Sequence, residues 1–144
     1  MEIREAVEND IEALTSLMEQ LGYPTTIEAM RTRFHTIESS PDYHTLVASY
    51  DGKIVGMVGM AKGYYYELNG VYVRIVALVV DVNFRNKGIG KKLVVEAESW
   101  ARIIGATRIG LNSGIRPERA HAHKFYKNIG YVEKSRGFVK SLPN

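Results

Sequence analysis

The stretch that decides the fold is Arg85-Asn86-Lys87-Gly88-Ile89-Gly90. It follows a hydrophobic run, Ile75–Val80, and opens an amphipathic segment that extends from Gly90 to about Ile104. A strand that leads through a glycine-containing turn into a helix forms an anion site, because the first N–H groups of the helix have no intrahelical partner and carry partial positive charge. The two glycines let a ligand approach the main chain closely. The stretch therefore predicts a site for a phosphate-bearing ligand.

Two common phosphate-binding loops do not fit this stretch. A P-loop needs an upstream glycine and a hydroxyl residue after its lysine, and Gly90-Lys91-Lys92 has neither. A dinucleotide-binding loop needs a third glycine or an alanine where this chain has Leu93. The pattern that fits is Arg or Gln, two residues, Gly, one residue, and Gly or Ala, placed directly after a strand.

This pattern resembles the pyrophosphate loop of the GNAT superfamily, the N-acyltransferases that use acyl-coenzyme A. The stretch 78–90 has the order of that family: a hydrophobic strand, an aromatic residue, Arg and Gly-x-Gly. A second block, 123–131, resembles the later signature of the family, with Ala122 four residues before Tyr126 and then a glycine and an aromatic residue. The resemblance covers the chain from Met1 to about Leu142.

Three positions depart from the family pattern. Asn86 stands where Gly is common, Val82 stands where Pro is common, and Arg119 stands where many members have Asn. None of these changes removes a main-chain donor from the loop. The difference at Arg119 concerns a contact with the pantetheine arm.

Composition and length indicate one ordinary globular domain spanning residues 1–144. The chain has 144 residues, 45% hydrophobic and 24% charged, and no cysteine, which excludes a disulfide framework, a thiolate zinc site and a Cys nucleophile. No apolar run approaches a membrane span, and the N-terminus has no signal-peptide pattern. We expect a cytoplasmic protein with no membrane partner. The net charge of +3 is mild, so we rank nucleic-acid binding below coenzyme A binding.

The sequence predicts an α/β fold with a mixed, mostly antiparallel sheet of six or seven strands and about four helices on its two faces. Asp51-Gly52 predicts a type I′ hairpin, and Gly56 and Gly59 predict a bulge or a close approach. The expected strands are 2–7, 43–50, 53–61, 71–81, 108–112 and a closing hairpin of 131–134 and 137–142. The expected helices begin at Asn9 or Asp10 and end at Gly22, run from Thr25 or Thr26 to about Ile37, run from Gly90 to Ile104, and run from Arg116-Pro117 to Gly130.

The resemblance implies a reaction and a cofactor site. It implies direct transfer of the acetyl group of acetyl-CoA to a primary amine, with no metal ion. Val80 and Val82 would offer main-chain groups to pantetheine, and the Val80 N–H would polarise the thioester carbonyl. Asn112 and Arg119 would lie near the pantetheine arm. The main-chain N–H groups that would hold the pyrophosphate belong to Arg85, Asn86, Lys87, Gly88, Ile89, Gly90 and Lys91.

Tyr126 is the residue that the resemblance implies as general acid for the leaving thiolate. On residue type alone a core aromatic beside Phe125 is the favoured interpretation, and the matching family context reverses this preference. The general base is not readable from the pattern: Glu67, in the loop before the central strand, is our choice. The other candidates are Asp81, His121, His123 and a water chain.

Several functions stay open at this point. A small-molecule acceptor comes first. A protein acetyltransferase that acts on Lys or an α-amino group, and a non-catalytic module that binds acyl-CoA, are the alternatives. A nucleic-acid binder with a coincidental glycine loop comes last. A homodimer is expected by similarity, because the closing hairpin could pair across an interface.

Overall fold

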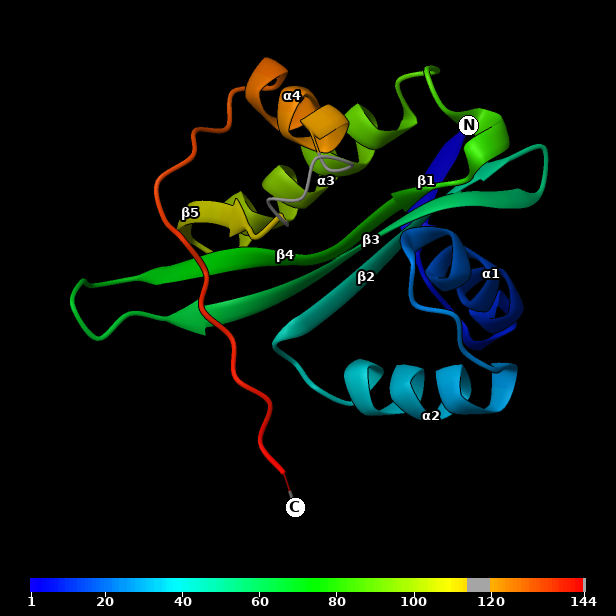
Figure 1. Ribbon diagram of the computed structural model, residues 1–144, viewed down its shortest axis with the longest axis horizontal. Helices are drawn as coiled ribbons and strands as arrows, with labels where there is room; N and C mark the ends of the chain where they lie inside the picture. The colour runs from blue at the N-terminus through cyan, green and yellow to red at the C-terminus, as the bar shows by residue number, and fades with distance from the viewer. Residues whose placement is uncertain (114–119, 144) are drawn as a thin grey trace. The chain divides into compact units, whose positions relative to one another are not determined.

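The computed structural model describes residues 1–113 and 120–143, which fall into two compact units, 1–110 and 111–144. The first unit is a sheet with helices on both faces, and the second holds one helix (Figure 1). The elements are β1 Glu2–Glu5, η1 Glu8–Asp10, α1 Ile11–Leu21, α2 Ile27–Glu38, β2 Tyr43–Tyr50, β3 Lys53–Tyr64, β4 Val71–Val80, η2 Val82–Phe84, α3 Ile89–Ile103, β5 Ala106–Leu111 and α4 Ala120–Asn128.

The sheet has five strands in the order β1-β2-β3-β4-β5. The first four strands pair antiparallel, each with the next. The Thr107 hydroxyl, near the start of β5, donates to the Val71 carbonyl at the start of β4, so these two strands run parallel. The predicted mixed and mostly antiparallel sheet is therefore confirmed.

The predicted number of six or seven strands is wrong, because the closing hairpin is not formed. None of the described residues 129–143 lies in a strand. Val132, Phe138 and Val139 are exposed instead of packed. Two short strands are stable only against a further partner, and strand propensity is mostly a measure of that packing. The apolar spacing at the C-terminus could therefore not settle whether strands form there. The predicted start of the last helix, at Arg116 and Pro117, lies outside the described residues.

The predicted turns and helix ends of the first unit are confirmed. Asp51 and Gly52 have φ values of 50° and 77°, which a type I′ turn requires, and Tyr50 pairs with Lys53 across it. Gly22, with φ 107°, ends α1 in the left-handed conformation. Thr26 caps α2, because its hydroxyl oxygen accepts the Ala29 N–H at 3.1 Å.

Alternate rows of the sheet face different helices. Val47, Met57 and Val79 lie in one row of the register, and they join the core that α1 and α2 contribute. The next row contains Gly56 and Val80 and faces α3. In Figure 1, α1 and α2 accordingly lie on one side of the strands and α3 on the other.

Asp10 is the N-cap residue of α1, where the helix was predicted to begin, and its side chain joins β1 to the helix. Its carboxylate accepts two hydrogen bonds from the Arg4 guanidinium, at 2.8 and 3.0 Å, and one from the Val7 N–H at 2.8 Å. The carboxylate is buried. The Arg4 hydrogen bond lowers the pKa of Asp10, and burial opposes this only in part. The pair therefore stabilises the folded chain most when Asp10 is ionised.

We expect Asp10→Asn to lower the free energy of unfolding at pH 7 by about 1–3 kcal/mol, because it replaces a charge-assisted bidentate contact. A lowered folded-state pKa gives stability that is present above the unfolded pKa of about 3.9 and is lost as the pH falls through the folded-state value. Urea unfolding at pH 7 and below pH 4 measures this. The variant should lose less stability on acidification than the wild type, and Glu96→Gln, at an exposed site, should behave as the wild type does. Equal losses in all three chains would contradict this role of Asp10.

Candidate functional site

The predicted phosphate loop connects β4 to α3 and is open to solvent. Arg85 to Gly88 are exposed. Asn86 has φ 63°, a left-handed conformation that Asn adopts more readily than most residues, which explains why it can replace Gly here. Gly88, with φ 78°, is the N-cap of α3, and a Cβ at this position would meet nothing within 4 Å. The loop therefore presents its main chain without side-chain cover at Gly88.

The first turn of α3 provides main-chain donors beside this glycine. The Lys92 N–H donates to the Gly88 carbonyl at 3.1 Å and begins the helical hydrogen bonds. The N–H groups of Ile89, Gly90 and Lys91 precede it in the first turn, where N–H groups have no intrahelical acceptor. With the helix dipole, they form the kind of site that binds phosphate.

The start of α3 is fixed to the sheet by the absence of a side chain at Gly56. A Cβ at Gly56 would lie 3.1 Å from Leu93 Cδ1 and 3.4 Å from Ile89 Cγ2. Both α3 side chains are buried. The predicted close approach at Gly56 is therefore confirmed. The register shift of β3 falls between Gly59 and Met60, so the predicted bulge is confirmed as well.

Asp81 organises the turn that leads into the loop. Its N–H donates to the Val55 carbonyl at 2.8 Å, and its carbonyl accepts the Phe84 N–H at 2.9 Å. Its buried carboxylate accepts the Asn83 N–H at 2.9 Å and the Gln20 amide at 3.3 Å. The Asn83 hydrogen bond lowers the pKa of Asp81 most, and the Gln20 amide lowers it further. A carboxylate with a lowered pKa is a weaker base, so this geometry favours a structural role for Asp81 over proton abstraction.

Gln20, at the end of α1, is a residue that the sequence analysis missed. Its side-chain oxygen accepts the Val82 N–H at 2.8 Å. Val82 was predicted to offer main-chain groups to pantetheine, and its N–H is bonded within the protein. Only the folded chain brings these residues together, because they are 62 positions apart. No local spacing in the sequence could have indicated the pair.

Phe84 and Arg85 hold the turn from the other side. The Phe84 ring lies 5.9 Å from the Tyr50 ring, and the Lys53 ammonium lies 5.5 Å from its centre. Tyr50 and Lys53 flank the β2–β3 hairpin turn. Arg85 Nε donates to the Val80 carbonyl at 3.4 Å, a long hydrogen bond. The aromatic position in the family pattern therefore anchors the loop to the neighbouring hairpin.

The structure separates other predicted residues from this loop. Glu67 is exposed in the connection before β4, while the loop follows the end of that strand. A ten-residue strand spans roughly 30 Å, so the structure does not bring Glu67 to the loop. Val80 is half-buried at the end of β4. Arg119 lies outside the described residues.

Tyr126 and Asn112 belong to the second unit. Asn112 is exposed after β5. Tyr126 is half-buried on α4, with its ring 5.4 Å from Phe125, edge-on, and 6.4 Å from Tyr131. The Tyr131 N–H donates to the Tyr126 carbonyl at 3.0 Å. The predicted aromatic-Tyr-Gly-aromatic block therefore forms one contiguous aromatic cluster.

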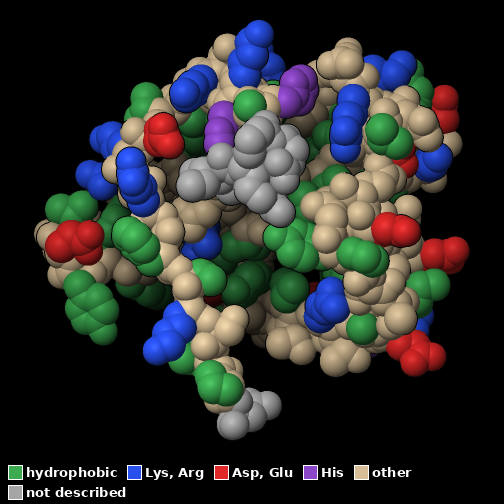
Figure 2. All heavy atoms as spheres, in the orientation of Figure 1, with side chains coloured by type: hydrophobic (Ala, Val, Ile, Leu, Met, Phe, Trp, Pro, Cys, Tyr) green, Lys and Arg blue, Asp and Glu red, His purple; other side chains and the backbone are tan. Residues whose placement is uncertain are grey.

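The distribution of charged side chains on the surface bears on the nucleic-acid-binding alternative. Figure 2 shows one face, on which Lys and Arg side chains are spread widely and Asp and Glu lie near them.

Within the described residues, no group of three or more His, Cys, Asp or Glu could hold a metal ion, and no helix is long and apolar enough to cross a membrane.

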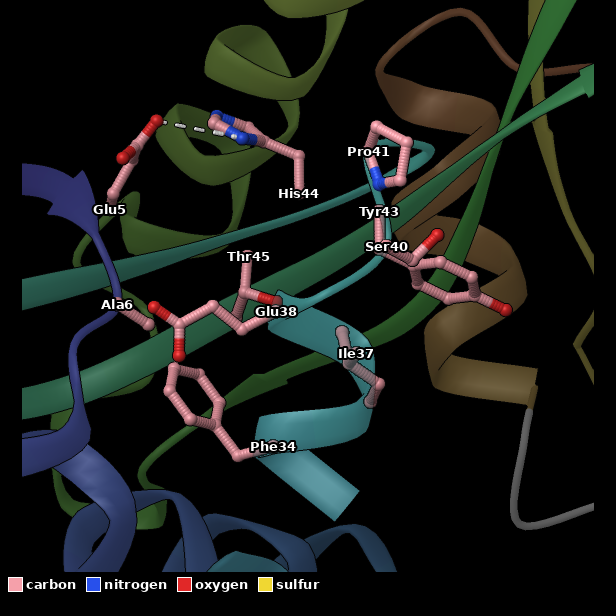
Figure 3. Close-up of a pocket in the computed structure, with 10 residues that line it drawn as sticks. All are labelled: Glu5, Ala6, Phe34, Ile37, Glu38, Ser40, Pro41, Tyr43, His44 and Thr45. Atoms are coloured by element: carbon pink, nitrogen blue, oxygen red, sulfur yellow. Dashed lines mark ion pairs between the residues drawn. The ribbon is translucent and has the colours of Figure 1, made fainter. Parts of the chain in front are cut away.

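A pocket of about 280 Å³ lies elsewhere in the first unit, between α2 and the strands β1 and β2 (Figure 3). Its lining residues include Phe34, Glu38 and Thr45. His44, at its edge, lies 3.7 Å from a Glu5 oxygen and stacks on Trp100 at 4.9 Å. None of the described residues that were predicted for cofactor binding or catalysis lines this pocket.

Comparison with known proteins identifies the family. Residues 11–131 match the Acetyltransferase (GNAT) family. The chain belongs to this family. It is therefore an acetyl-CoA-dependent acyltransferase.

One curated protein and two solved structures illustrate what this GNAT chain is similar to. The aminoalkylphosphonate N-acetyltransferase of Salmonella typhimurium is 30% identical over 98% of the chain and 91% of its own length. A GNAT family acetyltransferase of Staphylococcus aureus is 35% identical, with a TM-score of 0.85 and 98% of each chain covered. Aminoglycoside N-acetyltransferase AAC(6')-Iy in complex with CoA has a TM-score of 0.85 at 21% identity, covers 98% of this chain and 93% of that one, and supports the fold.

We expect Gly56→Ala to weaken coenzyme A binding several-fold and to destabilise the chain by about 1–3 kcal/mol, because the new methyl group pushes the first turn of α3 from the sheet. Gly59→Ala is the matched control, since its nearest neighbour would be at an ordinary 3.6 Å. Calorimetric titration with coenzyme A and thermal unfolding measure the two effects. If both variants bind coenzyme A as the wild type does, the start of α3 does not carry the site.

Proposed function

We propose that this chain, as one domain over residues 1–144, transfers the acetyl group of acetyl-CoA to the primary amine of a small molecule. The observation that carries this proposal is the loop at the start of α3, with its open glycine and its first-turn N–H groups beside Arg85 and Lys87. The relative that acts on aminoalkylphosphonates supports a small-molecule acceptor. An amine on a short carbon chain that bears a phosphonate or phosphate is the first acceptor to test.

The donor would be held by the loop, with the main-chain N–H groups from Arg85 to Lys91 on its pyrophosphate. Val80, at the end of β4, would direct its N–H to the thioester carbonyl and stabilise the oxyanion. The N–H of Val82 already donates to Gln20, so it is not available to pantetheine in this arrangement. Asn112 and Arg119 are proposed for the pantetheine arm on the family resemblance alone.

In the proposed reaction the amine nitrogen attacks the thioester carbonyl, the new C–N bond forms and the C–S bond breaks. Tyr126 would donate its hydroxyl proton to the leaving thiolate, and a base would take the proton that the amine loses. Glu67 stays a candidate for that base on its sequence position, although it lies at the opposite end of β4 from the loop. If a chain of water molecules takes the proton from the amine, no side-chain base is needed.

Titration with acetyl-CoA and coenzyme A tests the donor site. We expect saturable binding that is weakened about ten-fold or more in Arg85→Ala/Lys87→Ala, because two cations that face the phosphates are lost. Arg74→Ala/Arg102→Ala removes the same charge from exposed positions outside the loop and should bind as the wild type does. Absence of binding in the wild type would refute the donor site.

Tyr126→Phe tests the general acid. We expect kcat to fall about ten-fold or more, with the KM for acetyl-CoA nearly unchanged, because the ring stays and only the proton donor is lost. Tyr131→Phe, in the same aromatic cluster, is the matched control and should keep its kcat. Thiol release measured with saturating acceptor gives both constants. An unchanged kcat in Tyr126→Phe would remove this residue from the mechanism.

The alternatives predict other outcomes in the same assays. A protein acetyltransferase would turn over a Lys peptide faster than any aminoalkylphosphonate, aminoglycoside or polyamine in the acceptor panel. A non-catalytic module would bind acetyl-CoA without thiol release. A nucleic-acid binder would show steeply salt-dependent DNA binding and no coenzyme A binding. The cytoplasmic location and the homodimer stay predictions.

A further inference from the structure

One side-chain amide links the end of α1 to the turn before the cofactor loop. Gln20 Nε2 donates to Asp81 Oδ2 at 3.3 Å, and Gln20 Oε1 accepts the Val82 N–H at 2.8 Å. The donor and the acceptor of a single amide are thus both used, on two adjacent residues. A side-chain amide offers a donor and an acceptor in one plane without carrying a charge.

Two hydrogen bonds, only one of them to Gln20, fix the peptide between Asp81 and Val82 on both of its edges. The carbonyl of that peptide accepts the Phe84 N–H, and its N–H donates to Gln20. Because the peptide is planar, it cannot rotate without losing both bonds. The next N–H, of Asn83, is held by the Asp81 carboxylate. The direction in which the chain leaves the turn towards Arg85 is therefore set here.

The anchor at the other end of the link is rigid. Leu14 and Leu17 of α1 are each 1% exposed and pack in the core with Met57 and Val79 of the sheet. Gln20 follows them by one turn of the same helix. Gln20 therefore connects this buried core to the turn, in which Val82 and Asn83 are exposed.

We propose that Gln20 is a positioning residue for the acyl-donor loop, acting through Asp81 and Val82 without contact to the donor. The identity of the ligand rests on the proposed function, while the link itself is a property of the first unit. The proposal gives α1 a part in donor binding that its position in the sequence does not suggest. It also explains how Val82 stands where the family often has proline: the added N–H finds its acceptor in Gln20.

The first test removes the donor and the acceptor while keeping the length of the side chain. Gln20→Met should raise the Kd for coenzyme A about ten-fold, the cost of roughly two ordinary hydrogen bonds, and leave kcat at saturating acetyl-CoA within about two-fold. Glu19→Met is the matched control, since Glu19 is exposed on the same turn of α1. It should keep the wild-type Kd.

The second test restores the hydrogen bonds of residue 20 by protonation of a carboxyl group. In Gln20→Glu the introduced carboxyl repels Asp81 when both are ionised, and one of two adjacent carboxyls then has a raised pKa. When protonated, this carboxyl has the same donor and acceptor as the amide. The ratio of the variant Kd to the wild-type Kd should therefore fall towards one as the pH is lowered from about 8 to about 5.5, while the ratio for Gln20→Met stays constant. A merely structural role would give no such pH-dependent rescue.

The outcomes separate this proposal from the proposed function. If the wild type binds coenzyme A and Gln20→Met binds it equally well, the positioning role is overturned. A reduced affinity in Gln20→Glu that does not recover at low pH overturns it too. If the wild type does not bind coenzyme A, the proposed function fails. Faster amide exchange at Val82 and Asn83 in Gln20→Met would then still support the Gln20 link, and unchanged exchange would overturn it.

Discussion

The buried carboxylate of Asp81 is the interaction on which the candidate site depends. It lies where the central strand ends, and it accepts hydrogen bonds from Asn83 of the turn and from Gln20 of α1, while the Asp81 N–H donates to Val55 of β3. A buried charge is costly unless it is hydrogen-bonded, and the Asn83 N–H and the Gln20 amide supply the compensation. Its pKa is lowered because the ionised form receives the bonds. The turn is therefore most stable when Asp81 carries its charge.

The second constraint is the close packing of the start of α3 against β3. The start of α3 approaches β3 so closely that a Cβ at Gly56 would lie only 3.1 Å from the Leu93 side chain. The Ile89 and Leu93 side chains fill the space next to Gly56 and are buried. A helix whose first turn is packed in this way presents its N–H groups from a fixed place. Such preorganisation favours binding, because the loop loses little freedom when the ligand arrives.

Together, these constraints make the loop a well-supported main-chain surface. One end is held by Asp81 and by the Phe84 ring, which contacts the Tyr50 ring and the Lys53 ammonium, and the other end is held by α3. The charged side chains of Arg85 and Lys87 are exposed. The family assigns acetyl-CoA to this chain. Specificity for the acceptor has to come from other residues, because the loop is proposed for the acetyl-CoA donor alone.

The sequence by itself determined the local features of this protein. The type I′ turn at Asp51-Gly52, the cap at Thr26 and the strand–loop–helix unit around Gly88 depend on residues within a few positions of each other, so their patterns were sufficient. The family signature had the same basis. The strand pattern at the C-terminus was wrong, because strands need a neighbour and not only an alternation of side chains.

Only the tertiary structure decided the contacts that support the site. The Gln20 link spans 62 residues, the Tyr50–Phe84 contact joins a hairpin to the loop, and Glu67 proved to be at the far end of β4. Asp10 is the N-cap residue of α1 as predicted, but its carboxylate is bonded to Arg4 of β1 and not to the first turn of the helix. Such pairs depend on how the elements pack in space. Packing is set by the whole chain, and so no spacing within one segment could have predicted it.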